Sequence, residues 1–138
     1  MSTQNNKVLV SDVMMSLEQF PVIGEKIIFK EALEKMGEIK IGVACIVDKK
    51  YNLLGILTDG DIRRKLLKVQ KPFSAFFVDD ALLHAIHSPM TILPDVTLNS
   101  AVIIMGENKI WDLPVVDSHG VLVGLLHLHP AIKALLGE

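Results

Sequence analysis

The stretch that organises the chain is Met36-Gly37-Glu38-Ile39-Lys40-Ile41, which returns 69 positions later as Met105-Gly106-Glu107-Asn108-Lys109-Ile110. These segments belong to a longer match, in which residues 32–67 and 101–136 agree at 13 of 36 positions. Average composition predicts only about two or three identities by chance over that length. The chain therefore carries two copies of one structural unit.

Both copies show the same succession of hydrophobic periods. In the first copy, apolar residues at helical spacing over 29–36 predict a helix, and aliphatic runs at 43–47 and 53–57 predict an antiparallel hairpin. The second copy has the corresponding elements at 101–105, 113–116 and 121–126. A further helix is predicted after each hairpin, with the apolar residues Ile62, Leu66 and Leu67 in the first copy and Ile132, Leu135 and Leu136 in the second. With a strand before its first helix, each copy is expected to be a β-α-β-β-α unit.

The repeat also predicts how the chain is divided. We expect an N-terminal tail or linker (1–9), repeat 1 (10–69), a connector (70–87) and repeat 2 (88–138). Helical spacing of apolar residues within 79–87, stopped by Pro89, predicts a short helix in the connector. Neither copy can bury its apolar helix face well alone. We therefore expect an α+β fold in which the copies pack about a pseudo-twofold axis, with pockets at the seam.

Composition excludes several classes of protein. Fourteen Lys and Arg residues against sixteen Asp and Glu residues leave a formal net charge of −2, without the basic excess typical of proteins that bind nucleic acid or anionic membranes. No apolar run approaches the roughly 20 residues that span a bilayer. The single cysteine, Cys45, lies in an apolar run and is expected to fill the core. We expect a cytoplasmic protein with neither nucleic acid nor membrane as a partner.

Several landmark strings resemble a known family. In the first copy they are Ser11-Asp12-Val13-Met14, Ile46-Val47-Asp48 and Leu54-Gly55-Ile56-Leu57-Thr58-Asp59-Gly60-Asp61. In the second copy they are Ser88-Pro89-Met90, Leu113-Pro114-Val115-Val116-Asp117 and Val123-Gly124-Leu125-Leu126. Both sets resemble the cystathionine beta-synthase (CBS) domain. The resemblance covers nearly the whole chain from about residue 10, and it implies a tandem CBS pair that senses a nucleotide-type ligand.

Two strings resemble a narrower group, Thr58-Asp59-Gly60-Asp61-Ile62-Arg63-Arg64 and Leu126-His127-Leu128-His129. Together they are similar to the C-terminal CBS pair of bacterial arabinose 5-phosphate isomerases, which open the pathway to the lipopolysaccharide sugar Kdo. Sugar-phosphate nucleotidyltransferases with CBS domains carry residues similar to Thr58-Asp59-Gly60-Asp61, and the His-x-His ending favours the isomerases. Those enzymes carry catalysis on a separate sugar isomerase domain of about two hundred residues, for which this chain has no room. The resemblance implies a non-catalytic regulator of such a domain, in cis or in trans, and a homodimer.

Thr58 and Asp61 are the main candidates for binding a ligand. Thr58 is expected to end a strand and Asp61 to begin a helix, which brings a hydroxyl and a carboxylate to one rim. The matching positions in CBS domains hold a nucleotide. A carboxylate can accept both hydroxyls of a ribose, and a threonine hydroxyl can donate to a phosphate. Asp59 and Gly60 complete this site, Gly60 by letting backbone come close; the alternative is that Asp61 only caps the helix.

Arg63 and Arg64 follow on the first turn of the same predicted helix. A cation is unfavourable there because the helix dipole is positive at this end. A bound phosphate or sugar-acid carboxylate would compensate, since a guanidinium can bind either group through two hydrogen bonds. The alternative is one solvated arginine and one that pairs with a nearby acid such as Asp59.

His127 and His129 are expected to alternate on a strand end and face the same side, roughly 6 to 7 Å apart. We expect them to hydrogen-bond a ligand or to pack at the rim. A third metal ligand at a recognisable spacing is missing from the sequence, so no metal is expected. The remaining histidines, His84, His87 and His119, are expected to be solvated.

The second copy departs from the isomerase pattern. The repeat places His127 on Thr58 and Pro130 on Asp61, where the isomerases have an aspartate. Proline suits the first turn of a helix but offers no side-chain acceptor for a ribose. The second site is therefore expected to be degenerate, or to recognise something other than a ribose diol.

Two sets of ligands and one alternative function remain open. The CBS resemblance suggests AMP, ADP or ATP, and the isomerase resemblance suggests the end product CMP-Kdo; no resident cofactor is required. The alternative is a dimerisation or interaction module whose ligand sites are vestigial, consistent with Pro130. Trp111, which the repeat aligns with Gly42, stacks on a base under the first interpretation or packs at an interface under the second.

Overall fold

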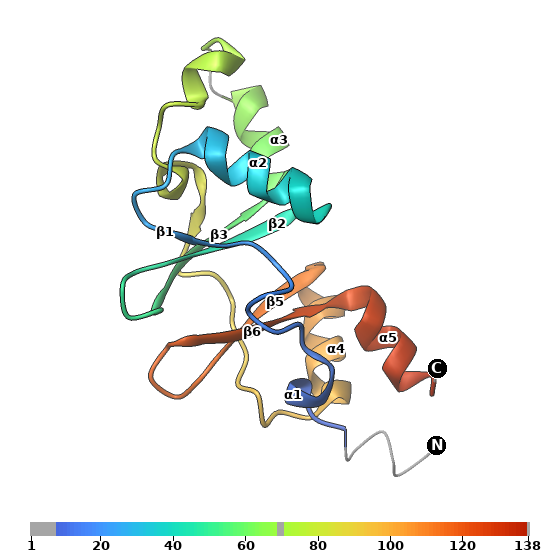
Figure 1. The fold of residues 1–138 in the computed structure, drawn as a ribbon. Helices are drawn as coiled ribbons and strands as arrows, with labels where there is room; N and C mark the ends of the chain where they lie inside the picture. The colour runs from blue at the N-terminus through green and yellow to red at the C-terminus, as the bar shows by residue number, and fades with distance from the viewer. Residues whose placement is uncertain (1–7, 69–70, 138) are drawn as a thin grey trace. The chain divides into compact units, whose positions relative to one another are not determined.

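The computed structural model describes residues 8–68 and 71–137, so most of the predicted tail and the boundary residues 69, 70 and 138 lie outside the described part. The chain forms two compact units. One is the central unit, Glu18–Pro89, and the other, the terminal unit, combines Met1–Leu17 with Met90–Glu138. Each unit contains one copy of the repeat, and the α-helices and most strands of both are labelled in Figure 1.

The central unit contains β1 (Val22–Gly24), α2 (Phe29–Ile39), β2 (Val43–Val47), β3 (Leu53–Thr58), α3 (Asp59–Lys68), the 3-10 helices η2 (Phe73–Phe76) and η3 (Ala81–His84), and β4 (Ile86–His87). The described strands form one sheet in the order β1-β2-β3-β4. β1 runs parallel to β2, and the other neighbours are antiparallel. The predicted helix–hairpin–helix succession is therefore confirmed in this copy.

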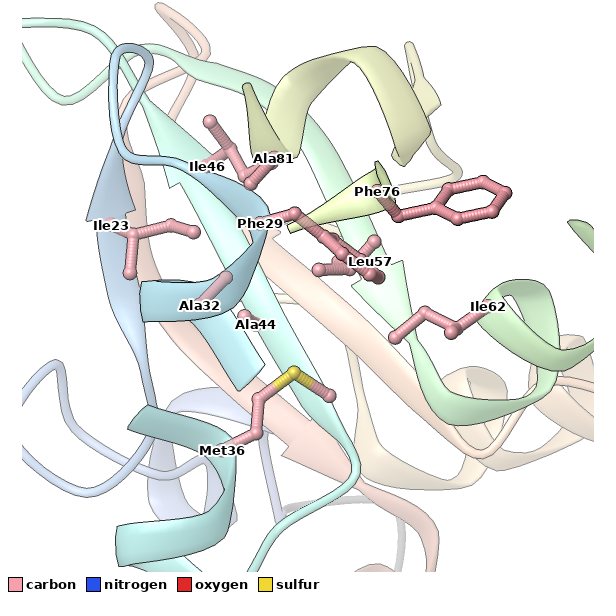
Figure 2. Close-up of a cluster of buried hydrophobic side chains, with 10 residues drawn as sticks. All are labelled: Ile23, Phe29, Ala32, Met36, Ala44, Ile46, Leu57, Ile62, Phe76 and Ala81. Atoms are coloured by element: carbon pink, nitrogen blue, oxygen red, sulfur yellow. The ribbon is translucent and has the colours of Figure 1, made fainter. Parts of the chain in front are cut away.

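The core of the central unit lies between the sheet and its helices. Alternate residues of β2, Ala44 and Ile46, point to the same face and meet Phe29 and Met36 of α2, as Figure 2 shows. Ile62 of α3 belongs to the same cluster. Aliphatic side chains dominate this core, in agreement with the low aromatic content of the sequence.

The terminal unit contains α1 (Val10–Val13), α4 (Leu98–Asn108), β5 (Asp112–Val116), β6 (Leu122–His127) and α5 (Leu128–Leu135). β5 and β6 form an antiparallel pair. Where the central unit has β1, the terminal unit has an isolated parallel bridge between Ile92 and Val115. The strand predicted at the start of repeat 2 is thus reduced to one residue, because Pro94, two residues after Ile92, has no amide hydrogen to donate to a strand ladder.

The two hairpins share irregular details as well as length. In both, the register shifts between the last two residues of the first strand. In both, a turn aspartate accepts the amides two and four residues further on, at 2.9 Å each for Asp48 and at 2.8 and 3.0 Å for Asp117. The helix before each hairpin also ends on a lysine with positive φ, 61° at Lys40 and 55° at Lys109. The repeat seen in the sequence is therefore a repeat of backbone conformation.

The N-terminal segment packs in the terminal unit. The Val10 amide donates to the Val96 carbonyl at 2.9 Å, and the Leu98 amide donates to the Val8 carbonyl at 2.8 Å. Val10 is fully buried in the core of this unit, and Figure 1 shows α1 beside α4. Val10, Val13 and Met14, which the sequence analysis assigned to repeat 1, therefore contribute their side chains to the core of the second copy.

The same segment reaches β6. The amide of Met15 donates to the carbonyl of Leu125 at 2.8 Å, and the reverse bond is 3.1 Å long. Leu125 is the repeat equivalent of Ile56, which pairs with Ile86 of β4. The second strand of each hairpin therefore pairs with a further segment. β3 pairs with β4 in the central unit, and β6 pairs with the N-terminal segment in the terminal unit.

A glycine on the second strand of each hairpin makes room for the segment that pairs with that strand. A Cβ at Gly55 would lie 3.0 Å from the carbonyl oxygen of Ile86, and a Cβ at Gly124 would lie 2.8 Å from that of Met15. Both distances are too short for a comfortable contact between a methyl group and a backbone oxygen. Close approach of two backbones therefore explains why both copies have glycine here.

The connector differs from its prediction. The helix predicted over 79–87 is a single 3-10 turn followed by the two residues of β4. The chain before that turn is held extended, because the amide of Phe29 donates to the carbonyl of Asp79 at 2.7 Å and the amide of Ala81 donates to the carbonyl of Ile27 at 2.9 Å. These bonds to the start of α2 compete with helical hydrogen bonds.

His84 is buried, contrary to the prediction that it is solvated. Its ring centroid lies 5.1 Å from that of Phe29 and 5.0 Å from that of Phe76. Nε2 lies 2.8 Å from Oδ2 of Asp79, which also accepts from Lys71 at 3.0 Å, whereas the buried Nδ1 has no partner among the described residues. These contacts lower the pKa of Asp79, the bond from Lys71 most and that from His84 next.

Candidate functional site

Thr58 and Asp61 occupy the first junction (residues 58–61), where β3 ends and α3 begins. The Thr58 hydroxyl donates to Oδ2 of Asp61 at 2.6 Å, and it accepts from the Asp61 amide at 3.2 Å. The predicted positions at a strand end and a helix start are confirmed. Thr58 rather than Asp61 caps the helix, since its hydroxyl satisfies an amide of the first turn.

The guanidinium of Arg64 lies against the first junction. Its Nη2 lies 2.6 Å from Oδ1 of Asp61, so both carboxylate oxygens of Asp61 have partners within the chain. The guanidinium crosses Gly60, where an added Cβ would lie 3.2 Å from Nη2. The arginine therefore pairs with Asp61 and not with Asp59. The side chain of Arg64 is 57% exposed and that of Arg63 is also exposed, so both remain accessible to a ligand.

Asp59 faces the start of the hairpin. Its amide donates to the carbonyl of Gly42 at 3.0 Å, and a Cβ at Gly42 would lie 2.6 Å from Oδ2 of Asp59. Gly42 therefore leaves the space that the Asp59 carboxylate uses. The negative charge lies in the first turn of α3, where the helix dipole stabilises it.

The second junction (residues 127–130) has a different set of side chains. His127 ends β6, and its Nδ1 lies 2.7 Å from Oδ1 of Asp112, the residue directly opposite on β5. The side chain of Asp112 is 12% exposed and that of His127 is 33% exposed. Burial raises the pKa of Asp112, although the hydrogen bond with His127 acts in the other direction.

Asp112 was missed from the sequence, although a signal was available. Val43, its equivalent in the first copy, pairs with Thr58 across the first hairpin. Applying the same register to the second copy places Asp112 opposite His127. A carboxylate opposite a histidine at a hairpin end therefore follows from the repeat once the register of the first hairpin is known.

His129 does not share a strand face with His127, so that prediction is wrong. The chain turns into α5 directly after His127, which places His129 on the first helical turn, where it is exposed. Pro130 follows on the same turn, where its missing amide hydrogen costs nothing. A strand cannot continue through this turn, and the alternation of side chains ends at His127.

Trp111 lies beside the second junction and is 69% exposed. Its carbonyl accepts from the Leu128 amide at 2.9 Å, as the carbonyl of Gly42 accepts from Asp59. Stacking on a base and packing at an interface both need a partner beyond the terminal unit, so both stay predictions. Within residues 8–68 and 71–137, no cluster of three His, Cys, Asp or Glu side chains could hold a metal ion. In the same residues, no helix is long and apolar enough to cross a bilayer.

The fold and the two junctions define the class of this protein. Two copies of a helix–hairpin–helix unit each end their hairpin in a strand-to-helix turn with polar side chains. The family model for the CBS domain matches residues 10–68 and 78–137. The chain belongs to the CBS domain family and contains two such domains in tandem, as the landmark strings predicted.

Individual relatives carry these domains within longer proteins. Arabinose 5-phosphate isomerase KdsD of Pseudomonas aeruginosa is 31% identical over 125 residues, which cover 91% of this chain and 37% of the isomerase. Inosine-5'-monophosphate dehydrogenase of Aquifex aeolicus is 35% identical over 105 residues, which cover 75% of this chain and 20% of the dehydrogenase. The chain spans 37–38% of the length of the first curated relatives that it matches. Similarity to an isomerase is therefore one of several of comparable strength.

A solved structure matches almost the whole chain. CBSX2 in complex with AMP is 26% identical, with a TM-score of 0.82 over 94% of this chain and 97% of that one. A second structure, of CBSX2 from Arabidopsis thaliana, has a TM-score of 0.79 at 25% identity, covering 94% of this chain and 95% of that one. The α+β fold predicted for a tandem CBS pair is confirmed.

Proposed function

We propose that this chain is a regulatory module that senses a nucleotide at the first junction. The observation that carries the proposal is the Thr58–Asp61 pair, a carboxylate on the first turn of α3 held 2.6 Å from a threonine hydroxyl. The similarity to CBSX2, whose structure is a complex with AMP, supports a nucleotide as the class of ligand.

The chemistry of the first junction suits a ribose phosphate. Asp61 accepts two hydrogen bonds from the chain itself and retains lone pairs for the hydroxyls of a ribose. Arg64 is 57% exposed, and exposed ion pairs contribute only about 0–1 kcal/mol, so its guanidinium exchanges Asp61 for a phosphate at little cost. Because α3 begins at Asp59, Arg63 and Arg64 lie one turn further along the helix than predicted; Arg63 is the second exposed cation, and Asp59 and Gly60 lie in the first turn with Asp61.

The regulated partner in this proposal is a sugar isomerase domain, joined in cis or bound in trans. The match to 37% of the KdsD isomerase supports this partner. AMP is a candidate ligand on the evidence of CBSX2, ADP and ATP are candidates from the resemblance to CBS domains, and CMP-Kdo is the candidate for feedback by an end product. A ligand that binds one conformation of the module better than another shifts the equilibrium between them, and thereby changes the partner's activity. We propose a cytoplasmic homodimer without catalytic activity of its own.

The test is a thermal-shift panel of AMP, ADP, ATP, CMP and CMP-Kdo on the wild type and on Asp61→Asn. A ligand that binds only the folded chain stabilises it by about 2.7 kcal/mol at one hundred times its Kd. We expect one ligand to raise the Tm of the wild type and to have little effect on Asp61→Asn. Glu38→Gln removes the same charge from an exposed position of α2 and serves as the matched control. Equal shifts in the wild type and Asp61→Asn would contradict the proposal.

The second candidate function is a dimerisation module with vestigial ligand sites. It is favoured by two exposed leucines at equivalent positions of the copies, Leu67 on α3 at 77% and Leu136 after α5 at 68%. Exposed leucines at repeated positions suit a contact with a second copy of the chain. Light scattering after gel filtration of Leu67→Lys and Leu136→Lys would then report monomers where the wild type is a dimer. A nucleotide panel without any shift would favour this candidate.

A further inference from the structure

A groove in the central unit includes no residue of either junction. It lies between the strand β1 and the helix α2 and has a volume of about 310 Å³, with apolar residues such as Ile23 and Ile27 on one side and the carboxylates of Glu31, Glu34 and Glu38 on the other. We propose that this groove binds an extended, basic segment of a partner protein, which pairs with β1 as an added strand and directs lysine or arginine side chains at α2. The inference does not rest on the proposed function, because the groove and the first junction have no residue in common.

β1 presents backbone hydrogen-bonding groups at the edge of its sheet. Among the strands of the described residues, it pairs with β2 alone. The amide of Cys45 donates to the carbonyl of Pro21 at 2.9 Å, so the backbone of Pro21 faces β2, and the backbones of Val22 and Gly24 face away from it. The carbonyl of Gly24 accepts from the Ile27 amide at 3.2 Å. Both backbone groups of Val22 and the amide of Gly24 are therefore directed to the side where a further strand would bind.

The helical side of the groove is acidic. Glu31, Glu34 and Glu38 are exposed and follow one another at spacings of three and four residues, which places them on one face of α2. Among the described residues, no lysine or arginine lies within ion-pair distance of these three carboxylates. Glu34 and Glu38 are four residues apart, and like charges at that spacing destabilise a helix. A cation supplied by a partner would remove this repulsion.

The dimensions of the groove suit basic residues at alternate positions of a strand. Ile23 is 4% exposed and Ile27 is half-buried against the same core, and Figure 2 shows Ile23 in the cluster with residues of α2. Apolar surface of this kind packs against the aliphatic stems of lysine and arginine. Glu34 and Glu38 are about 6 Å apart along the helix axis, and alternate residues of a strand are about 6.6 Å apart. Two basic side chains on one face of an added strand can therefore each reach a carboxylate.

The second copy shows that the repeated fold does not require these charges. The equivalents of Glu31 and Glu34 on α4 are Ser100 and Ile103, and Ile103 is 53% exposed. The equivalent of β1 is the single bridge at Ile92. Hydration of a helix face does not explain why one copy has carboxylates where the other exposes an isoleucine. The acidic helix face therefore belongs to the copy that also has the longer edge strand.

The test measures fluorescence anisotropy of labelled hexapeptides with the full chain. The first probe is acetyl-Ser-Lys-Val-Arg-Val-Ser-amide, which has basic residues at alternate positions. The second replaces both basic residues by glutamate, and the third places the two basic residues next to each other. Because the alternate spacing forms two charge-assisted bonds, we expect the first to bind roughly tenfold or more tightly than the second and roughly threefold or more tightly than the third. Equal binding of the first and third probes would mean attraction by net charge alone and would overturn the inference.

Two further probes test the pairing with β1. A strand bonds to its neighbour through the amides of alternate residues, so methyl groups are placed on the backbone nitrogens either of the two valines or of the two basic residues. We expect one of these peptides to bind roughly tenfold more weakly than the unmethylated probe, since two of its amides no longer donate. If both methylated peptides bind as tightly as the first probe, no strand is added to β1 and the inference is wrong.

Variants of the chain locate the site. The double variant Glu31→Gln with Glu34→Gln should bind the first probe roughly tenfold more weakly, with its circular dichroism unchanged. Glu107→Gln, at the exposed equivalent of Glu38 in the second copy, is the matched control and should bind as the wild type does. Asp61→Asn should also bind the peptide normally, because Asp61 lies outside the groove. Unchanged affinity in the double variant would overturn the inference, whatever the result of the nucleotide panel.

Discussion

The two strand-to-helix junctions are alike in backbone and opposite in side-chain chemistry. At the first, the helix begins with an amide bonded to the Gly42 carbonyl at 3.0 Å, and at the second the equivalent bond to Trp111 is 2.9 Å long. On these matching frames the chain places Thr58 and Asp61 in one copy and His127 and Pro130 in the other. The bonds that determine the backbone are the same in both copies, and the side chains at the positions predicted to contact a ligand differ.

Among the variants that test this comparison, substitutions of the equivalent glycines Gly55 and Gly124 should change stability most. Gly124→Ala should destabilise the fold by roughly 2–3 kcal/mol, because the new methyl group would meet the Met15 carbonyl at 2.8 Å. Gly55→Ala should cost about 1–2 kcal/mol, since its closest backbone contact is 3.0 Å. Urea denaturation measures both. The control Gly106→Ala lies on α4 with open space around it and should be neutral or stabilise by up to about 1 kcal/mol. Equal stability of Gly124→Ala and the wild type would mean that Met15 does not lie on β6.

The next effect distinguishes the two cores. His84→Ala should destabilise the central unit by roughly 2–3 kcal/mol, because it empties a buried space between Phe29 and Phe76 and removes a bond to Asp79. Thermal unfolding followed by near-ultraviolet circular dichroism measures the change. His119→Ala, at an exposed turn of the terminal unit, should stay within about 0.5 kcal/mol of the wild type. A loss no larger than that of His119→Ala would show that His84 does not hold this core together.

Opposite pH dependences provide a third test. Hydrogen bonds lower the pKa of Asp48, that from the Asn52 side chain most, and backbone amides lower that of Asp117, Val121 first. Carboxylates of this kind stabilise the fold above their unfolded pKa of about 3.8, and the contribution disappears as the pH falls through the folded value. Stability of Asp48→Asn and of Asp117→Asn should therefore fall less steeply on acidification than that of the wild type.

Asp112 should show the reverse behaviour. Burial raises its pKa, so its ionisation on going above about pH 3.8 costs stability in the folded chain. As the pH rises from about 3 to about 5, the wild type should therefore lose stability relative to Asp112→Asn. Urea denaturation at several pH values measures this. A difference that is constant with pH would show that Asp112 has no raised pKa.

The smallest effect concerns Arg64. Arg64→Ala should change stability by no more than about 0.5 kcal/mol, because the ion pair with Asp61 involves a side chain that is 57% exposed. Under the proposed function it should nevertheless weaken nucleotide binding, which isothermal titration calorimetry can measure. Arg63→Ala tests the other exposed arginine of the proposed site in the same way. Unchanged affinity in both variants would remove the arginines from the ligand site.

Much of the fold could be predicted because the repeated residues determine the backbone. Asp48 and Asp117 form the same turn, and Gly55 and Gly124 accept the same close approach, so identities at these positions mark the hairpins. The contribution of Met15 to β6 could not be predicted, since one bridged residue between distant segments leaves no pattern in either. Burial of His84 was missed for a similar reason, because its contacts come from α2 and η2 and not from its own neighbours.

The candidate site was predictable in position but not in its partners. Thr58 and Asp61 lie where the sequence predicted, yet the bond between them and the closure by Arg64 depend on side-chain rotamers. His129 was misplaced because the strand was extended past the helix start. Asp112 required the cross-strand register, which a reading along the chain does not supply.

The pairing of the N-terminal segment with the terminal unit has a consequence for synthesis on the ribosome. Residues 8–17 leave the ribosome before the central unit, and the strand β6 and the helix α4 that they pack against leave it after the central unit. At about 5–20 residues per second, the delay is on the order of 10 s. The central unit has all its residues well before that, so the terminal unit assembles second. Until then the backbone groups of Met15 have no strand to bind, and the nascent chain exposes an apolar segment that a chaperone can hold.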